Sequence, residues 1–263
     1  MYSYRHHRWA LSEILDRADK IPQDVQKYWK RRRNLFSKYN EGIKLTRELW
    51  FSVTAEAVAN YLAKFIQHCY PETRTVVDLF CGGGGNSIQM IRLFDRCICV
   101  DYNETNLACT KNNVYVYFSP EQLQHAGKTI EFVHCDWKYA LPTTSPTDQA
   151  AYNKTQQFIQ NIKSDIVFAS PPWGGPEYLN QEKFNLRNIE PLPLEDLLRS
   201  CLQISPVIVL FLPRNSDLDQ LMEISRQVFG PGVKVRVTKA VMRNRVKGLL
   251  CFWGDKFYDY QRK

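Results

Sequence analysis

The stretch VVDLFCGGGGN, residues 76–86, decides the fold of this chain. An apolar run containing Asp78 leads directly into four consecutive glycines, and the following segment 87–94 has the spacing of a helix. Glycines let the backbone approach a ligand closely, and the first turn of a helix offers unpaired N–H groups. The stretch therefore predicts a strand, a ligand-binding turn and a helix, the opening unit of an α/β fold.

Two nucleotide-binding fingerprints fit this turn poorly. The dinucleotide pattern G-x-G-x-x-G, counted from Gly82 and Gly84, places Ser87 where the third glycine belongs, and a P-loop needs Gly-Lys-Ser/Thr. The turn instead resembles motif I of the S-adenosylmethionine-dependent methyltransferases. The residues that carry this resemblance are Asp78, Cys81, Gly82, Gly84 and Asn86. A tight glycine turn without a function is the alternative.

Beyond residue 75 the sequence alternates between strand and helix patterns. Strands are predicted at 75–80, 96–100, 130–134, 165–169, 206–212, 234–241 and 248–253, and helices at 87–94, 104–115, 120–125, 194–202 and 217–229. Five strands that alternate with helices and two adjacent last strands describe a Rossmann-like, mostly parallel seven-stranded sheet with a terminal antiparallel hairpin. The polar stretch 142–163 is predicted to be a surface insertion.

Two acidic residues end predicted strands in this sheet. Asp101 ends the second strand, where a carboxylate can accept both hydroxyls of a ribose, and Asp136 ends the third, where it can accept from an adenine amino group. Each is equally explained as the N-cap of a following helix. Only the combination with the glycine turn favours a nucleoside site.

The loop SPPWGGPEY, residues 170–178, follows the fourth predicted strand. Its two prolines are stiff and lack N–H donors, so Ser170 and the Pro171 carbonyl can accept hydrogen bonds from an exocyclic amino group. The ring of that ligand could stack on Trp173. The alternative is a proline-rich turn with Trp173 in the core.

Basic residues are predicted near the same rim. Arg214 and Asn215 follow the fifth strand, where arginine suits a phosphate or a base edge, or else forms a salt bridge while its neighbours cap a helix. The last predicted hairpin contains a second basic cluster, which is either a binding surface or only a solvated turn. Its residues are Lys239, Arg243, Arg245 and Lys247.

The N-terminal part is basic and aromatic. Residues 1–24 predict a mobile arm or an isolated helix, and the basic run 30–33 predicts a solvated helix face, phosphate contacts or a nuclear import signal. The segment that follows, WFSVT at 50–54, precedes a helix predicted to end near residue 69. In amino-group methyltransferases a similar segment closes over the methionine end of the cofactor. The alternative for Trp50 and Phe51 is a hydrophobic staple onto that helix.

Composition limits the classes of function. The 263 residues, 44% of them hydrophobic, suit one domain with appendages, and a net charge of +8 with a pI of about 9.0 favours an anionic partner such as a nucleic acid. Eight cysteines without a C-x-x-C pair favour reduced, buried thiols over disulfides or zinc ligands, and we expect no metal. Without a signal-like start or an apolar run of about 20 residues, we expect a soluble intracellular protein that does not engage a membrane.

The motifs WFSVT, DLFCGGGGN, SPPWGGPEY and FLPRNSD, in this order behind a basic run, resemble the trimethylguanosine synthase family, above all its fungal members, over residues 27–260. The resemblance implies a class I S-adenosylmethionine-dependent methyltransferase domain at 54–263 behind a helical extension at 1–53. It implies two successive methyl transfers to the 2-amino group of 7-methylguanosine caps of small nuclear and small nucleolar RNAs. The expected setting is the nucleus and nucleolus, with ribonucleoprotein partners and a monomeric enzyme.

The resemblance also implies roles for individual residues. Ser170, Pro171 and Trp173 would be catalytic. The cofactor would be held by Phe51, Ser52, Thr54, Asp78, Cys81, Gly82, Gly84, Asn86, Asp101, Asp136 and Ser170. The cap would be held by Trp173, Tyr178, Arg214, Asn215 and Lys44.

One position departs from the wider pattern of amino-group methyltransferases. These enzymes carry Asp or Asn before Pro-Pro, whereas this chain has Ser170, whose hydroxyl is no ready base and leaves the proton acceptor unassigned. An adenine 6-amino methyltransferase on DNA or RNA remains the alternative enzyme. A non-catalytic RNA-binding module on a methyltransferase fold is the alternative outside enzymes.

Overall fold

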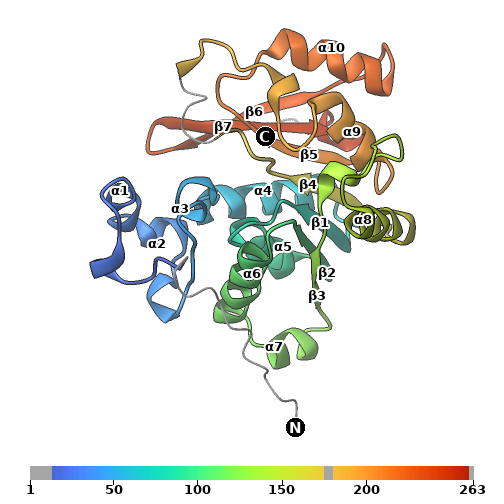
Figure 1. The fold of residues 1–263 in the computed structure, drawn as a ribbon. Coiled ribbons are helices and arrows are strands. Elements are labelled where there is room, and N and C mark those ends of the chain that lie inside the picture. The colour runs from blue at the N-terminus through green and yellow to red at the C-terminus, as the bar shows by residue number, and fades with distance from the viewer. Residues whose placement is uncertain (1–13, 175–179, 261–263) are drawn as a thin grey trace.

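The structure is a computed structural model that describes residues 14–174 and 180–260. Its centre is a seven-stranded sheet in the order β3-β2-β1-β4-β5-β7-β6 (Figure 1). All neighbouring pairs from β3 to β5 are parallel, and β7 is antiparallel to both β5 and β6. The bounds are β1 Thr75–Leu79, β2 Arg96–Asp101, β3 Thr129–His134, β4 Ile166–Ala169, β5 Ile208–Leu212, β6 Arg236–Met242 and β7 Arg245–Trp253. The predicted sheet with its terminal hairpin is confirmed.

Helices cover both faces of the sheet. One face carries α8 (Gln149–Asn161), α9 (Leu194–Leu202) and α10 (Leu218–Phe229), and the other carries α4 (Glu56–Cys69) and α5 (Gly85–Leu93) (Figure 1). Two more helices, α6 (Glu104–Tyr117) and α7 (Pro120–His125), connect β2 to β3. Burial on both faces explains why the central strands β4 (IVFA) and β5 (IVLFL) are apolar at every position instead of alternating.

Helix α8 lies inside the polar stretch 142–163 that was predicted to be a surface insertion. Its N-terminus is capped by Asp148, whose side chain accepts the Ala151 N–H at 3.0 Å. Thr155 and Ile159 are buried on the inner side of the helix, whereas most of its other side chains are exposed or half-buried. The stretch therefore supplies the crossover helix that connects β3 to β4, two parallel strands of the same sheet. Its apolar stripe is too narrow to be recognised from the sequence.

The N-terminal extension consists of short helices: η1 (Ala18–Lys20), α1 (Gln26–Trp29), α2 (Arg32–Leu35), η2 (Tyr39–Glu41) and α3 (Leu49–Ser52). Ile14 pairs with Thr46 in an antiparallel bridge, and the Leu15 N–H donates to the Leu45 carbonyl at 2.9 Å. Ile14 and Ile21 are buried. For residues 14–24 the expectation of a mobile arm or isolated helix is wrong, because their apolar side chains fill a shared cluster; residues 1–13 lie outside the described residues.

The cysteines, all within the described residues, are buried, and none of them forms a disulfide. In the described ranges no group of three or more His, Cys, Asp or Glu side chains is arranged to hold a metal ion. None of the helices in those same ranges is both long enough and apolar enough to cross a bilayer.

Candidate active site at the carboxyl edge of the sheet

Five strand ends bring the predicted site residues into one row. Because parallel strands share a carboxyl edge, the residues that follow β3, β2, β1, β4 and β5 are neighbours in that order. Backbone hydrogen bonds join the strand ends: Cys135 N–H to the Asp101 carbonyl (3.0 Å), Cys81 N–H to the Val100 carbonyl (3.0 Å) and Ser170 N–H to the Leu79 carbonyl (3.4 Å). The glycine turn and the diproline loop therefore open at the same edge, as predicted.

The glycine turn is shaped by positive backbone angles and by close packing. Gly84 adopts a left-handed φ of 78° as the N-cap of α5, a conformation that costs other residues more. A Cβ atom at Gly85 would lie 2.7 Å from the Thr54 carbonyl oxygen, so the α3–α4 connection rests directly on the turn. From α6, Thr110 Oγ1 donates to the Gly82 carbonyl and Asn113 Nδ2 donates to the Gly83 carbonyl at 2.9 Å. These contacts hold the turn rigidly in place.

Asp101 contacts the glycine turn directly. Its Oδ2 accepts the Gly82 N–H at 2.8 Å, and its Oδ1 accepts the Asn103 N–H at 2.9 Å. Burial raises the pKa of Asp101 to about 6, although both backbone hydrogen bonds lower it. The carboxylate is thus fixed beside the turn, where it can accept further hydrogen bonds from a ligand.

Buried acceptors lie beneath the turn. Asp78 is fully buried and accepts a hydrogen bond from the Ser87 hydroxyl, and burial raises its pKa to about 7. The Oδ1 atoms of Asp78 and Asn86 are buried without a donor among the described residues, while Asn86 Nδ2 donates to Thr54 Oγ1 at 3.1 Å. Acceptors that lack a donor suit a ligand that carries N–H groups, such as the ammonium group of an amino acid.

The diproline corner holds Trp173 half-buried. Its Nε1 donates to the Phe211 carbonyl of β5 at 3.2 Å, and the two rings meet edge to face with centroids 5.3 Å apart. The indole is therefore oriented by β5 and still accessible to solvent, unlike a core residue. The Pro172 carbonyl already has a donor, because it accepts the Glu190 N–H at 3.4 Å. Of the two proline carbonyls, only that of Pro171 has no donor among the described residues.

The residues of α3 and of the α3–α4 connection divide into core residues and candidate site residues. Trp50 is buried and its Nε1 donates to the Leu15 carbonyl at 3.1 Å, so it belongs to the core. Phe51 is half-buried against the edge of Tyr28, and Ser52 is exposed. The Lys44 backbone N–H donates to Asn113 Oδ1 at 2.8 Å, which places Lys44 beside the glycine turn.

The phosphate-binding candidates occupy the rim after β5. Arg214 is exposed there. Asn215 turns toward the preceding loop, with its Nδ2 donating to the Gln181 carbonyl at 2.8 Å and its own carbonyl accepting the Phe184 N–H. Tyr178 lies outside the described residues.

Comparison with known proteins identifies the family of this chain. Residues 73–256 match the family described as RNA cap guanine-N2 methyltransferase. The chain belongs to the RNA cap guanine-N2 methyltransferase family. It is 39% identical over 237 residues to the trimethylguanosine synthase of Saccharomyces cerevisiae, covering 89% of this chain and 69% of that protein. It is 30% identical to the trimethylguanosine synthase of Schizosaccharomyces pombe, over 90% and 88% of the two chains.

Solved structures confirm the methyltransferase fold. A candidate methyltransferase of Porphyromonas gingivalis W83 matches with a TM-score of 0.61 at 18% identity, over 89% of this chain and 51% of its own, so our chain spans about half the length of that protein. An S-adenosylmethionine-dependent methyltransferase of Agrobacterium tumefaciens matches with a TM-score of 0.50 at 17% identity, over 77% and 63% of the chains. At these identities the likeness concerns the fold alone.

In this cap guanine-N2 methyltransferase, Asp136 has the position of a helix cap. Its Oδ1 accepts the Lys138 N–H at 3.2 Å and its Oδ2 forms a 3.0 Å salt bridge with Lys138 Nζ. The N-cap interpretation of Asp136 is therefore confirmed. The remaining lone pairs of the carboxylate can still accept from a base.

Sequence reasoning missed two residues of the cap guanine-N2 methyltransferase edge. Tyr102 follows Asp101 and is 52% exposed; burial raises its pKa, and so do four nearby carboxylates, those of Glu48, Asp101, Asp136 and Glu190. Glu190 reaches the diproline corner through its backbone N–H. The aromatic residue directly after a strand-ending acid was a usable signal for Tyr102. No local signal marked Glu190, which lies in an irregular loop.

Proposed function

We propose that this chain transfers two methyl groups in succession to the exocyclic 2-amino group of a 7-methylguanosine cap and produces the 2,2,7-trimethylguanosine cap. The observation that carries the proposal is the joint edge: a diproline corner with an oriented, half-open indole lies on the strand next to a glycine turn. The names of the fungal relatives support it.

S-adenosylmethionine supplies an electrophilic methyl group on a sulfonium. The residues present fit this group, because Asp78 and Asn86 offer buried acceptors to its ammonium and Asp101 lies beside the glycine turn for its ribose. Thr54 supports Asn86 from the lead-in segment. These residues bind and orient the donor without needing a metal ligand.

The diproline corner would act on the acceptor nitrogen. A guanine amino group is a weak nucleophile because its lone pair is delocalised into the ring. Hydrogen bonds to Ser170 and the Pro171 carbonyl would favour a pyramidal nitrogen and direct its lone pair at the methyl group. In each transfer a nitrogen–carbon bond forms, the sulfur–carbon bond breaks and one proton leaves the nitrogen. Catalysis would come mainly from positioning.

Trp173 would select the methylated cap. A 7-methylguanosine ring is cationic, and a cation over an indole is stabilised by about 2 kcal/mol or more in a desolvated site. This energy corresponds to a preference of roughly tenfold or better over unmethylated guanosine. Arg214 and Lys44 would contact the triphosphate bridge, and the same role is proposed for Asn215 and Tyr178.

The proposed substrates are small nuclear and small nucleolar RNAs, bound in the nucleus and nucleolus by a monomeric enzyme with ribonucleoprotein partners. The net charge of +8 is consistent with a polyanionic substrate. Fractionation of cells that express a tagged chain, followed by sequencing of RNAs crosslinked to it, tests this setting. Uniform distribution and crosslinks without capped RNAs would contradict it.

The reaction is tested with labelled S-adenosylmethionine and two RNAs that differ only in the 7-methyl group of the cap. We expect labelling of the 7-methyl-capped RNA and far less of the unmethylated one. Chromatography of the digested nucleosides must show label on 2-methylated guanosine. Equal labelling of both RNAs, or label on adenine, would refute the proposal and favour the adenine 6-amino alternative.

A further inference from the structure

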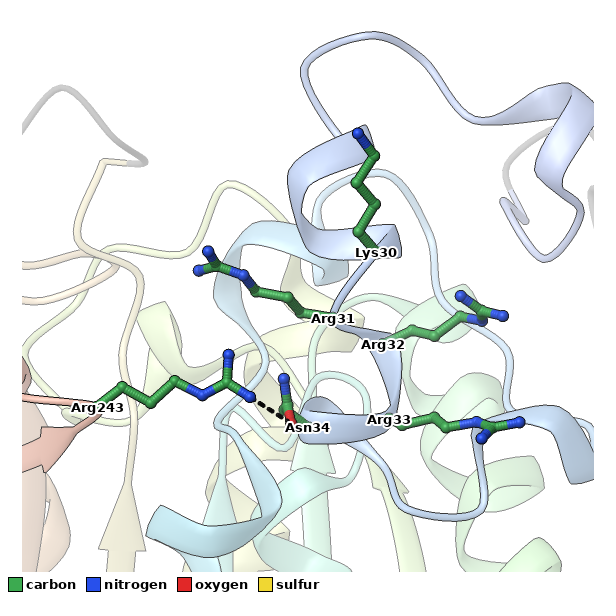
Figure 2. A pocket seen from close by; sticks show the side chains of 6 residues that line it. All are labelled: Lys30, Arg31, Arg32, Arg33, Asn34 and Arg243. Atoms are coloured by element: carbon green, nitrogen blue, oxygen red, sulfur yellow. Dashed lines mark hydrogen bonds between the residues drawn. The ribbon is translucent and has the colours of Figure 1, made fainter.

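The basic run of the N-terminal extension and the turn between β6 and β7 form one cleft, although they lie about 200 residues apart in the sequence. Arg243 Nη2 donates to Asn34 Oδ1 at 3.3 Å across the cleft. Figure 2 shows Arg31, Asn34 and Arg243 converging on one side, whereas Arg32 and Arg33 point the other way. The cleft has a volume of about 420 Å³, and its lining is Lys30, Arg31, Arg32, Arg33, Asn34 and Arg243.

The β6–β7 turn belongs to the same edge as the candidate active site. Strand β7 is antiparallel to β5 and pairs Leu249 with Leu212, the last residue of β5. The residues before Leu249 therefore extend beyond the end of β5, and at about 3.3 Å per residue Arg245 lies roughly 13 Å past it. In Figure 1 this red hairpin tip reaches toward the blue helices α1 and α2. The cleft thus continues the rim on which Arg214 is exposed.

The positive charges of the cleft are close enough to affect one another. Lys247 is half-buried, and its pKa is lowered first by that burial and then by four guanidinium groups, those of Arg245, Arg31, Arg214 and Arg243. Among the described residues no carboxylate forms a salt bridge with any of these five side chains. A cluster of cations without acidic partners is an electrostatic site for an anion.

The turn itself gives a second reason to regard the charge as functional. Arg243 and Asn244 have φ angles of 51° and 60°, the left-handed pair of a two-residue hairpin turn. Such turns favour Asn, Asp or Gly at the first position, so arginine brings no conformational benefit to the turn. What Arg243 contributes is its guanidinium.

We propose that Arg31 and Arg243 of the cleft, together with the neighbouring Arg245 and Lys247 of β7, bind the phosphodiester backbone of the first transcribed nucleotides that follow the cap. This inference rests on the proposed function, since it needs the cap at Trp173 and its triphosphate at Arg214. From there the RNA chain would cross from the β5 rim into the cleft. Cationic side chains without aromatic or apolar lining recognise phosphates and not bases, so binding is independent of RNA sequence.

A nuclear import carrier is a weaker candidate for this surface. The basic run is folded into the ends of α1 and α2, and the Arg32 guanidinium lies over the Trp29 ring at 4.7 Å while it donates to the Trp29 carbonyl. An extended recognition peptide cannot form there without unfolding those helices. RNA phosphates need only the exposed guanidinium groups.

The test removes two charges without disturbing the turn. In the double variant Arg31→Gln/Arg243→Asn, asparagine is the residue that the left-handed position prefers. The substrates are a 7-methyl-capped dinucleotide and a 7-methyl-capped RNA of twelve nucleotides. We expect kcat/KM to fall about tenfold on the longer RNA at low salt and to stay within about twofold on the dinucleotide. In anisotropy titrations the salt slope of RNA binding should decrease by about 0.7 for each lost contact.

Arg226→Gln is the matched control. Arg226 is exposed in the last turn of α10, which places it at the opposite edge of the sheet because α10 begins at the β5 rim. Its loss changes the net charge without touching the cleft. An unchanged slope in the double variant, or an equal decrease in the control, would overturn the proposal.

A further pair of outcomes separates the cleft from the proposed function. Equal loss on the dinucleotide and the longer RNA would assign these charges to the cap triphosphate and would also overturn the proposal. If the wild-type chain methylated neither substrate, the proposed function would fail, yet the anisotropy slope would still decide whether the cleft binds RNA phosphates.

Discussion

The Trp173 side chain is both anchored and accessible. Its N–H donates to the Phe211 carbonyl of β5, while part of its ring is exposed to solvent. We expect Trp173→Ala to reduce turnover on a 7-methyl-capped RNA at least about a hundredfold, because base stacking and orientation are lost together. Calorimetric binding of S-adenosylmethionine should survive, because the hydrogen bond and the ring contact that orient the indole are both made with Phe211 of β5. The measurement is paired labelling and titration calorimetry.

Trp173→Phe is the control for that change. It keeps an aromatic ring for stacking, removes the hydrogen bond to the Phe211 carbonyl and replaces the indole by a smaller ring. We expect it to retain most of the preference for the methylated cap. If Trp173→Ala instead lost cofactor binding and thermal stability together, the indole would be core packing and not a cap platform.

Asp78 makes a pH prediction possible. Burial raises its pKa from the ordinary 3.8 to about 7 in the folded chain. A carboxyl whose folded pKa is raised keeps its proton in the folded state while the unfolded chain ionises, so stability without ligand should fall as pH rises from about 4 to about 7. Asp101, raised to about 6, adds the same trend over a narrower window. Thermal melts across this range provide the measurement.

Ligand binding should show the opposite trend. The ionised Asp78 accepts more strongly from an ammonium group, so affinity for S-adenosylmethionine should rise between about pH 6 and 8. In Asp78→Asn we expect weaker binding and a flat profile over that interval, measured by calorimetry. A profile that stays steep in the variant would show that another group titrates.

At the scale of elements, the absence of a side chain at Gly85 lets the α3–α4 connection pack directly against the start of α5. In Gly85→Ala the new Cβ would meet the Thr54 carbonyl at 2.7 Å. We expect a loss of about 1–3 kcal/mol of stability and weaker cofactor binding, although alanine by itself favours a helix. Chemical denaturation gives the first quantity and calorimetry the second.

Gly232→Ala is the matched control, because a Cβ there has no atom within 4 Å and the glycine has no positive φ. It should change stability by less than about 1 kcal/mol. Equal losses in both variants would mean that the turn can shift away from Thr54, and that the lead-in segment does not constrain it.

Elements also differ in how far the sequence reveals them. Helix α9 and helix α7 were predicted at their observed bounds, because each carries a clear apolar side or a capping signal. Helix α8 was missed, because only Thr155 and Ile159 of its residues are buried. Its place is set by the need to connect β3 to β4, which no local pattern records.

At the scale of the whole molecule, the N-terminal extension and the sheet share one hydrophobic cluster. Leu45, Leu49 and Trp50 are buried in a cluster with Ile88 and Cys109 of the methyltransferase domain. We therefore expect a chain that starts at residue 54 to lose its cooperative thermal transition, because removal of the N-terminal extension exposes this apolar surface to water. Calorimetry of the full chain should show a single transition. Two separate transitions, or a truncated chain with an unchanged melting temperature, would make the extension an independent unit.

The sequence by itself determined the α/β order and the glycine turn, because periodicity and glycine conformations are local properties. It also predicted the row of site residues, because strands that alternate with helices are parallel and share a carboxyl edge. It also placed Asp101 and Trp173 at that edge. Only the tertiary structure decided that Asp136 caps a helix, that the Pro172 carbonyl accepts from Glu190, and that Arg31 and Arg243 line one cleft. These features depend on contacts between residues far apart in the chain. Such contacts arise from packing and leave no pattern within a short stretch of sequence.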